Sequence, residues 1–201
     1  MHFNPSEVYH IYNRGDHRQQ LFFSDENYIF FLKKIRNEWL KYGDILAYCL
    51  MPNHFHFIMA PNEKACINVI IGDKISSMQN LSQAIGKTLS SYTRALNIQN
   101  DTTGTLFQKK TKAKALLEDS QLSTHEYLEA CFHYIHENPL AAKMVNDLKN
   151  WPYSSYPDYF GFRTGTLCNK QKLMYLLSYT QFDFRKSFDI DFNLPIFKNI
   201  F

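Results

Sequence analysis

The spacing of apolar positions along the chain predicts an alternation of strands and helices. Apolar residues recur every three or four positions in three stretches, which we expect to be helices at 26–42, at 76–96 and from Ser123 or Thr124 to Asn138. β-branched and aromatic residues dominate shorter stretches, which predict strands at 8–13, 45–51, 54–60 and 113–117. The order β-α-β-β-α-β-α is typical of an α+β, ferredoxin-like split βαβ fold, with an antiparallel sheet, helices on one face and an added C-terminal helix.

Turn and capping residues mark where these elements end. Ser24 or Asp25 can cap the first helix, and Pro52-Asn53 predicts a tight connection between two strands that pair as a hairpin. Residue 138 should be the last residue of the third helix, because the residue before a proline disfavours the helical conformation. Beyond 161 the pattern weakens, so we assign one domain to 1–161 and treat 162–201 as an extension of the same domain.

Composition is that of a folded protein with a hydrophobic core. The chain has 201 residues, of which 45% are hydrophobic and 20% charged, and this excludes wholesale disorder. The four isolated cysteines exclude a zinc ribbon and offer no disulfide framework. No stretch of 18 apolar residues occurs, so we expect a cytoplasmic protein without a membrane partner. The net charge of +3 permits a nucleic-acid partner without requiring one.

Two histidines in the fourth predicted element are candidate metal ligands. His54 and His56 are two positions apart on a strand, so their side chains share one face, at roughly 6.6 Å between Cα atoms. Neutral imidazoles at that separation can share one divalent ion. Taken alone, a His-x-His motif is more often a pair of half-buried histidines that form hydrogen bonds within a sheet.

The third predicted helix carries a candidate nucleophile. Tyr134 and Asn138 are four positions apart and therefore lie on one helical face. A tyrosine hydroxyl near a metal ion can attack phosphorus, and an amide oxygen is a hard ligand compatible with Mg²⁺ or Mn²⁺. By composition alone, however, Tyr134 is one of 13 tyrosines and a core position is the more economical interpretation.

Basic residues gather in two segments that could contact phosphates. Arg14 and Arg18 follow the first strand, and Lys109, Lys110 and Lys112 precede the last strand. Such clusters bind nucleic-acid backbones by releasing counterions. A solvated loop explains any single one of these lysines equally well.

Several blocks of the sequence, taken together, resemble REP-associated tyrosine transposases and related single-tyrosine HUH transposases. The blocks occur in the family's order, span roughly residues 8–161, and are YHIYNRG at 9–15, QLFF at 20–23, AYCLMPNHFHFI at 47–58, GTLFQ at 104–108, YIHENP at 134–139 and WPYSSY at 151–156. After Gln108, many relatives continue with an arginine-aromatic pair, whereas this chain has Lys109-Lys110-Thr111-Lys112. Positive charge is kept there and the aromatic ring is missing.

The resemblance implies a function for each matched position. His54 and His56 would bind Mg²⁺ or Mn²⁺ with Asn138 as a third polar ligand. Tyr134, on the catalytic helix, would form a 5′-phosphotyrosine link to single-stranded DNA that carries hairpins. The segment 1–161 would then be an HUH single-tyrosine transposase domain, and some relatives act as homodimers.

Two alternative functions remain compatible with the residues. One is a replication-initiator-like HUH nuclease, which cuts DNA without moving its own gene. The other is a non-catalytic module that binds single-stranded nucleic acid, since a four-stranded sheet rich in aromatic residues also suits base stacking. The binding-only alternative predicts no covalent adduct and an affinity that does not depend on metal.

Overall fold

A four-stranded antiparallel sheet organises the computed structural model, which describes residues 1–116 and 124–180. Its strands are β1 (Tyr9–Arg14), β2 (Gly43–Met51), β3 (His54–Pro61) and β6 (Lys112–Ala115). They are arranged in the order β2-β3-β1-β6, with antiparallel pairing throughout. This is the strand order of a split βαβ unit, and it confirms the predicted α+β, ferredoxin-like fold class.

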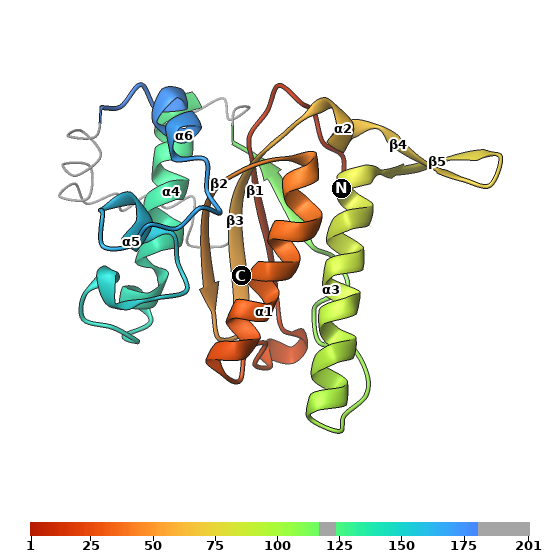
Figure 1. Cartoon of the computed structure of the whole chain (residues 1–201), viewed down its shortest axis with the longest axis horizontal. Coiled ribbons are helices and arrows are strands. Elements are labelled where there is room, and N and C mark those ends of the chain that lie inside the picture. Colours follow the sequence, from red (N-terminus) through yellow and green to blue (C-terminus); the bar gives the residue numbers. More distant parts are fainter. Residues whose placement is uncertain (117–123, 181–201) are drawn as a thin grey trace.

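Helices pack on both faces of this sheet. The long helices are α1 (Asp25–Trp39), α3 (Asn80–Gln99) and α4 (Thr124–Ala141). Helix α1 covers the face that carries the phenylalanines of β3, where the Phe31 and Phe55 ring centroids are 5.4 Å apart and those of Trp39 and Phe57 are 5.1 Å apart. Helix α3 packs beside α1, and α4 lies on the other side of the sheet (Figure 1). The added C-terminal helix therefore covers the face that α1 and α3 leave open.

Short elements connect and extend this framework. They are the 3-10 helices η1 (Asp16–Arg18), η2 (Leu40–Tyr42) and η3 (Leu148–Asn150), and the helices α2 (Glu63–Cys66), α5 (Tyr156–Tyr159) and α6 (Lys170–Leu176). Arg163 ties the segment after α4 to β2, because it donates to both carboxylate oxygens of buried Asp158 and to the Tyr48 hydroxyl. No helix in the described part of the chain is both long and apolar enough to cross a membrane.

A projecting β-hairpin replaces the expected start of the second helix. Strands β4 (Asn68–Ile71) and β5 (Lys74–Gln79) pair with each other and extend away from the main sheet (Figure 1). The helix predicted from residue 76 therefore begins only at Asn80, because Gly72 turns the chain at a positive φ of 59°. The buried Gln79 amide then fixes the start of α3 by bonding to Phe3 and to the Cys66 carbonyl.

Pro139 does not end α4, contrary to the sequence prediction. The helix continues to Ala141, and the chain reverses at Lys143, whose φ is +56°. Pro139 removes only one helical hydrogen bond, and the ladder resumes beyond it, where the Ala142 N–H donates to the Asn138 carbonyl at 2.9 Å. The last strand also differs slightly from the prediction of 113–117: it spans Lys112–Ala115, and residue 117 lies outside the described residues.

We expect the stability of this fold to decrease as pH falls, in part because of His136. This histidine is buried, its Nδ1–H donates to the Phe132 carbonyl and its Nε2 accepts from the Ser155 hydroxyl, both at 2.8 Å. Burial lowers its pKa to about 3. Between the ordinary histidine pKa of about 6.5 and that value, the unfolded chain binds a proton that the folded chain does not, so stability rises with pH.

Urea unfolding between pH 7 and pH 4 checks this expectation. His136→Leu should flatten the dependence of unfolding free energy on pH by up to about 1.4 kcal/mol per pH unit. The comparison concerns the slope, so a general loss of stability in the variant does not obscure it. Equal slopes in the two proteins would show that His136 is not held neutral by the fold.

Candidate active site

The register of β1 against β3 places four ring side chains on one face of the sheet. Tyr12 is directly opposite His56, and His10 is opposite Ile58, so His10, Tyr12, His54 and His56 point to the same side. We call this side the histidine face. It is the side opposite the phenylalanines of β3, which pack under α1. The predicted pairing of His54 with His56 is therefore observed, with ring centroids 5.0 Å apart.

Helix α4 brings Tyr134 onto the histidine face. The Tyr134 ring stands edge-on to His56 and His10, at centroid distances of 5.6 and 6.4 Å. Asn138, one turn further along α4, forms side-chain hydrogen bonds with both His54 and Tyr134. The structure thus gathers all four residues that the sequence singled out for catalysis and metal binding, from β3 and from α4.

A neighbouring side chain occupies the Nδ1 nitrogen of each β3 histidine. His54 Nδ1 is 2.7 Å from the Asn53 amide oxygen, and His56 Nδ1 is 2.9 Å from His10 Nε2. Because an amide oxygen only accepts, the His54 proton is on Nδ1. The other ring nitrogen, Nε2, then carries the lone pair of this imidazole.

Burial keeps these imidazoles neutral. It lowers the pKa of His54 to about 4 and that of His10 to about 3, and it holds the pKa of His56 well below its usual range. A hydrogen bond with Asn138 opposes the change at His54, and the nearby Arg14 charge adds to it. At neutral pH the histidines therefore carry the uncharged form that metal ligation requires.

The same burial makes Tyr134 a weaker acid. Desolvation raises the pKa of its hydroxyl to about 12, although the hydrogen bond with Asn138 acts in the opposite direction. The phenol is thus neutral at physiological pH and needs positive charge nearby to become a nucleophile. Half-buried Arg14 is opposite His54 in the β1–β3 register, and its positive charge acts on that ring.

The donor set fits a divalent cation completed by a substrate. Within residues 1–116 and 124–180, no group of three or more His, Cys, Asp or Glu side chains could hold a metal ion. Two neutral imidazoles and the Asn138 amide are the candidate donors, and this mixture of nitrogen and oxygen donors is compatible with Mn²⁺ or Mg²⁺. Three donors would leave further coordination positions of such a cation open to other oxygen ligands.

Arg14, the last residue of β1, and Arg18, the last residue of η1, lie beside this site. Arg18 is exposed and, with His54, lines a hollow of about 500 Å³ that also includes Gln20, Asn53 and Met144. Gly15 allows the tight turn between the two arginines, because a Cβ there would lie 2.0 Å from the Gln19 carbonyl oxygen. Arg14 and Arg18 therefore flank the metal-ligand candidates at the end of β1.

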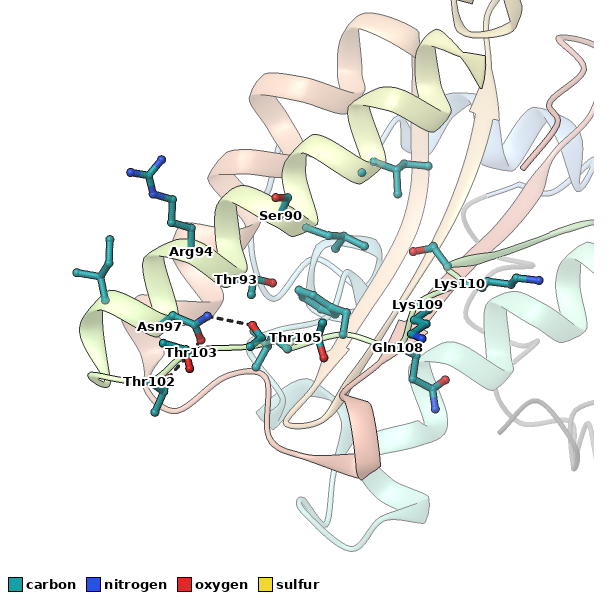
Figure 2. Close-up of a pocket in the computed structure, with 18 of the residues that line it drawn as sticks. Ser90, Thr93, Arg94, Asn97, Thr102, Thr103, Thr105, Gln108, Lys109 and Lys110 are labelled. Atoms are coloured by element: carbon teal, nitrogen blue, oxygen red, sulfur yellow. Dashed lines mark hydrogen bonds between the residues drawn. The ribbon is translucent and has the colours of Figure 1, made fainter. Parts of the chain in front are cut away.

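The lysine cluster, by contrast, is divided between two regions. Lys112 is opposite Tyr12 in the β1–β6 register, so it lies on the histidine face at the sheet edge. Lys109 and Lys110 instead line a groove of about 1340 Å³ between α3 and residues 101–111, which we call the α3 groove. Figure 2 shows both lysines on the loop side of this groove, and Ser90, Thr93 and Asn97 on the helix side.

Sequence reasoning did not single out His10 or Tyr12 as site residues. Their rings stack at a centroid distance of 4.6 Å, and Tyr12 lies 6.1 Å from His56. Alternation along a strand already indicates that positions 10 and 12 share a face. Only the pairing of β1 with β3, however, shows that this face is the one that carries His54 and His56.

Comparisons with known proteins support the fold relationship. The chain is similar to the solved structure of a REP-associated tyrosine transposase bound to a REP hairpin, with a TM-score of 0.55 and 15% sequence identity. The match covers 80% of this chain and 83% of the other. No protein-family model and no curated protein matches the chain. At this level of identity, the two chains share a fold.

Proposed function

We propose that this protein is a metal-dependent endonuclease and strand transferase that cleaves single-stranded, hairpin-bearing DNA through a 5′-phosphotyrosine intermediate. The observation that carries the proposal is the convergence of Tyr134, Asn138, His54 and His56 on the histidine face. The fold likeness to a transposase bound to a DNA hairpin supports it. So do the sequence blocks that resemble the same family.

The proposed reaction is a transesterification that needs no further reactant. The Tyr134 hydroxyl oxygen attacks the phosphorus of one phosphodiester, forms a tyrosine–phosphate bond and displaces the 3′-oxygen of the preceding nucleotide. The phenol loses one proton and the departing 3′-oxygen gains one, so charge and atoms balance. Attack by a 3′-hydroxyl on the phosphotyrosine reverses these bonds and joins the strands.

The side chains around Tyr134 divide the work of this reaction. His54, His56 and Asn138 would hold Mg²⁺ or Mn²⁺, which, when bound, polarises the scissile phosphate and stabilises the negative charge that develops there. Arg14 adds a fixed positive charge next to the His54 ring. Asn138 orients the Tyr134 hydroxyl, because it forms a hydrogen bond with that side chain.

We infer that the DNA strand contacts both basic regions of the surface. Lys112 and Arg18 flank the histidine face, whereas Lys109 and Lys110 line the α3 groove on the far side of the edge strand β6. A strand cleaved at Tyr134 can extend around this edge and place its neighbouring phosphates in the groove. Cleavage and affinity then depend on different lysines.

Replacing Tyr134 with phenylalanine should abolish cleavage and leave DNA binding nearly intact, because only one oxygen is removed. Reactions with labelled hairpin oligonucleotides, resolved on a denaturing gel, measure both the cut strand and the covalent protein–DNA band. Peptide mass spectrometry should locate the DNA on the tryptic peptide that contains Tyr134. An adduct that persists in Tyr134→Phe would move the nucleophile to another residue.

Two tyrosines provide matched controls for this experiment. Tyr12 is the stringent one, because its ring also lies near His56 and its hydroxyl is a rival nucleophile. Tyr127, two turns earlier on α4, is buried under the Lys114 ammonium group and should be inert. Both Phe variants should still form the adduct. A wild-type protein that binds hairpins and never forms an adduct would instead be a binding module.

Cleavage should require Mg²⁺ or Mn²⁺ and should be lost in His56→Ala. The reason is that one of two neutral imidazole ligands disappears, while the sheet and its hydrogen-bond ladder remain. Activity with and without a chelator, together with circular dichroism of the variant, checks both parts of the expectation. Full cleavage by His56→Ala in the presence of chelator would remove the metal from the mechanism.

Substitution of both Lys109 and Lys110 with alanine should weaken hairpin binding and its dependence on salt. Each lost phosphate contact lowers the slope of log affinity against log salt concentration by about 0.7 on a single strand. Fluorescence anisotropy at several salt concentrations measures this slope. The control is Lys87→Ala, which removes a lysine of α3 that lies outside the groove. Unchanged slopes would exclude the α3 groove from the DNA path.

A further inference from the structure

The His10 side chain is buried next to His56, one of the proposed metal ligands. It is 2% exposed, and its ring stacks on His56 with an interplanar angle of 24° and on Tyr12 with an angle of 29°. The Tyr134 ring packs edge-on against the same imidazole, with ring centroids 6.4 Å apart. His10 is thus buried among the site's own aromatic rings rather than exposed to substrate.

A single proton links His10 to His56. His10 Nε2 and His56 Nδ1 are 2.9 Å apart, and both rings are neutral at pH 7. Two neutral imidazoles in this contact have two possible arrangements, because either nitrogen can carry the shared proton. If His10 donates, the second proton of the pair is on His56 Nε2. If His56 donates, its Nε2 carries a lone pair.

Only the second arrangement suits a metal ligand at His56. The nitrogen on the far side of the ring from His10 is Nε2, and it must present a lone pair to a cation. His10 must then accept the hydrogen bond at Nε2 and carry its own proton on Nδ1. His54 has the same arrangement, since its Nδ1–H donates to the Asn53 amide oxygen at 2.7 Å. Each histidine of the pair therefore has its own acceptor.

We propose that His10 is a positioning residue for the metal site: it accepts the Nδ1–H of His56 and thereby holds that ring in the tautomer and orientation that ligate. The inference rests on the proposed role of His56 as a ligand. An acceptor behind a ligating histidine both fixes the ring and increases its basicity, and its removal typically weakens metal affinity roughly 10- to 100-fold. His10 is then required for metal binding without touching the metal or the DNA.

The backbone holds His10 in place for this task. It is the second residue of β1, and it is paired on both sides, with Ile58 of β3 and with Lys114 of β6. Stacking against Tyr12 fixes the plane of the ring, so the direction of its Nε2 lone pair is fixed as well. A shift of one residue in register would place His10 on the opposite face of the sheet.

Manganese titration of three DNA-free variants tests the proposal. His10→Phe keeps a flat ring of similar size and loses the acceptor, so the dissociation constant for Mn²⁺ measured by calorimetry should increase roughly 10- to 100-fold. His10→Gln keeps an oxygen that can accept from His56 and should recover part of this loss. His56→Ala reports the affinity without the ligand itself.

The outcomes separate this inference from the proposed function. If His56→Ala weakens Mn²⁺ binding and His10→Phe does not, the positioning role of His10 is wrong and the metal site stands. Both proposals fail if the wild-type protein binds no Mn²⁺, or if the His56→Ala variant binds Mn²⁺ as tightly as the wild-type protein does. Circular dichroism and metal-free hairpin binding establish whether each variant keeps its fold.

If His10→Phe does not fold, the tautomers of His10 and His56 can be measured in the wild-type protein. Long-range ¹H–¹⁵N correlation spectra distinguish the two tautomers of each imidazole. With saturating Mg²⁺, His56 and His10 should both be protonated at Nδ1. Protonation of His56 at Nε2 under these conditions would overturn the proposal, because that nitrogen could not then be a ligand.

Discussion

The antiparallel pairing of β1 with β3 is the constraint on which the candidate site depends. Its register places His10, Tyr12 and Arg14 opposite Ile58, His56 and His54, so that polar rings collect on one face of the sheet. The alternation of side chains sends Phe55 and Phe57 to the other face, where α1 packs against them. One register thus determines both the hydrophobic core and the position of the imidazoles.

Desolvation by α4 then decides the chemistry of the histidine face. By covering the rings, the helix lowers the pKa of the histidines and raises the pKa of Tyr134 to about 12. The first effect favours metal binding, because neutral imidazoles ligate without losing a proton. The second means that Tyr134 would need added positive charge nearby to act as a nucleophile.

The edge strand β6 separates two groups of lysines that are close together in the sequence. Lys112 is on the histidine face, and Lys109 and Lys110 lie in the α3 groove. The loop that carries these two residues is anchored, because Phe107 packs on Phe31 and Gln108 donates its N–H to the Arg14 carbonyl. The backbone segment that carries Lys109 and Lys110 therefore also supports the end of β1, near the proposed metal ligands.

Local periodicity by itself determined much of this protein. Spacings within a few residues predicted the strands β2 and β3, the helix α1 and the shared face of His54 and His56. The structure contains each of these features. The i, i+4 relation of Tyr134 and Asn138 is local too. Resemblance to a known family added the interpretation of these residues, which periodicity alone left open.

Tertiary structure decided what depends on contacts between distant segments. His10 and His56 are 46 positions apart, and no local pattern indicates which residue of β1 meets which residue of β3. The β4–β5 hairpin was not predicted, because Met78 has a helical spacing to the apolar residues that follow it. The start of α3 is set instead by Gln79, which is hydrogen-bonded to Phe3, 76 positions away in the sequence. Pro139 stays within α4 because the helical hydrogen bonds resume beyond it, where the Ala142 N–H donates to the Asn138 carbonyl. Spacing is a property of one segment, whereas register, burial and hydrogen-bond partners exist only once segments meet.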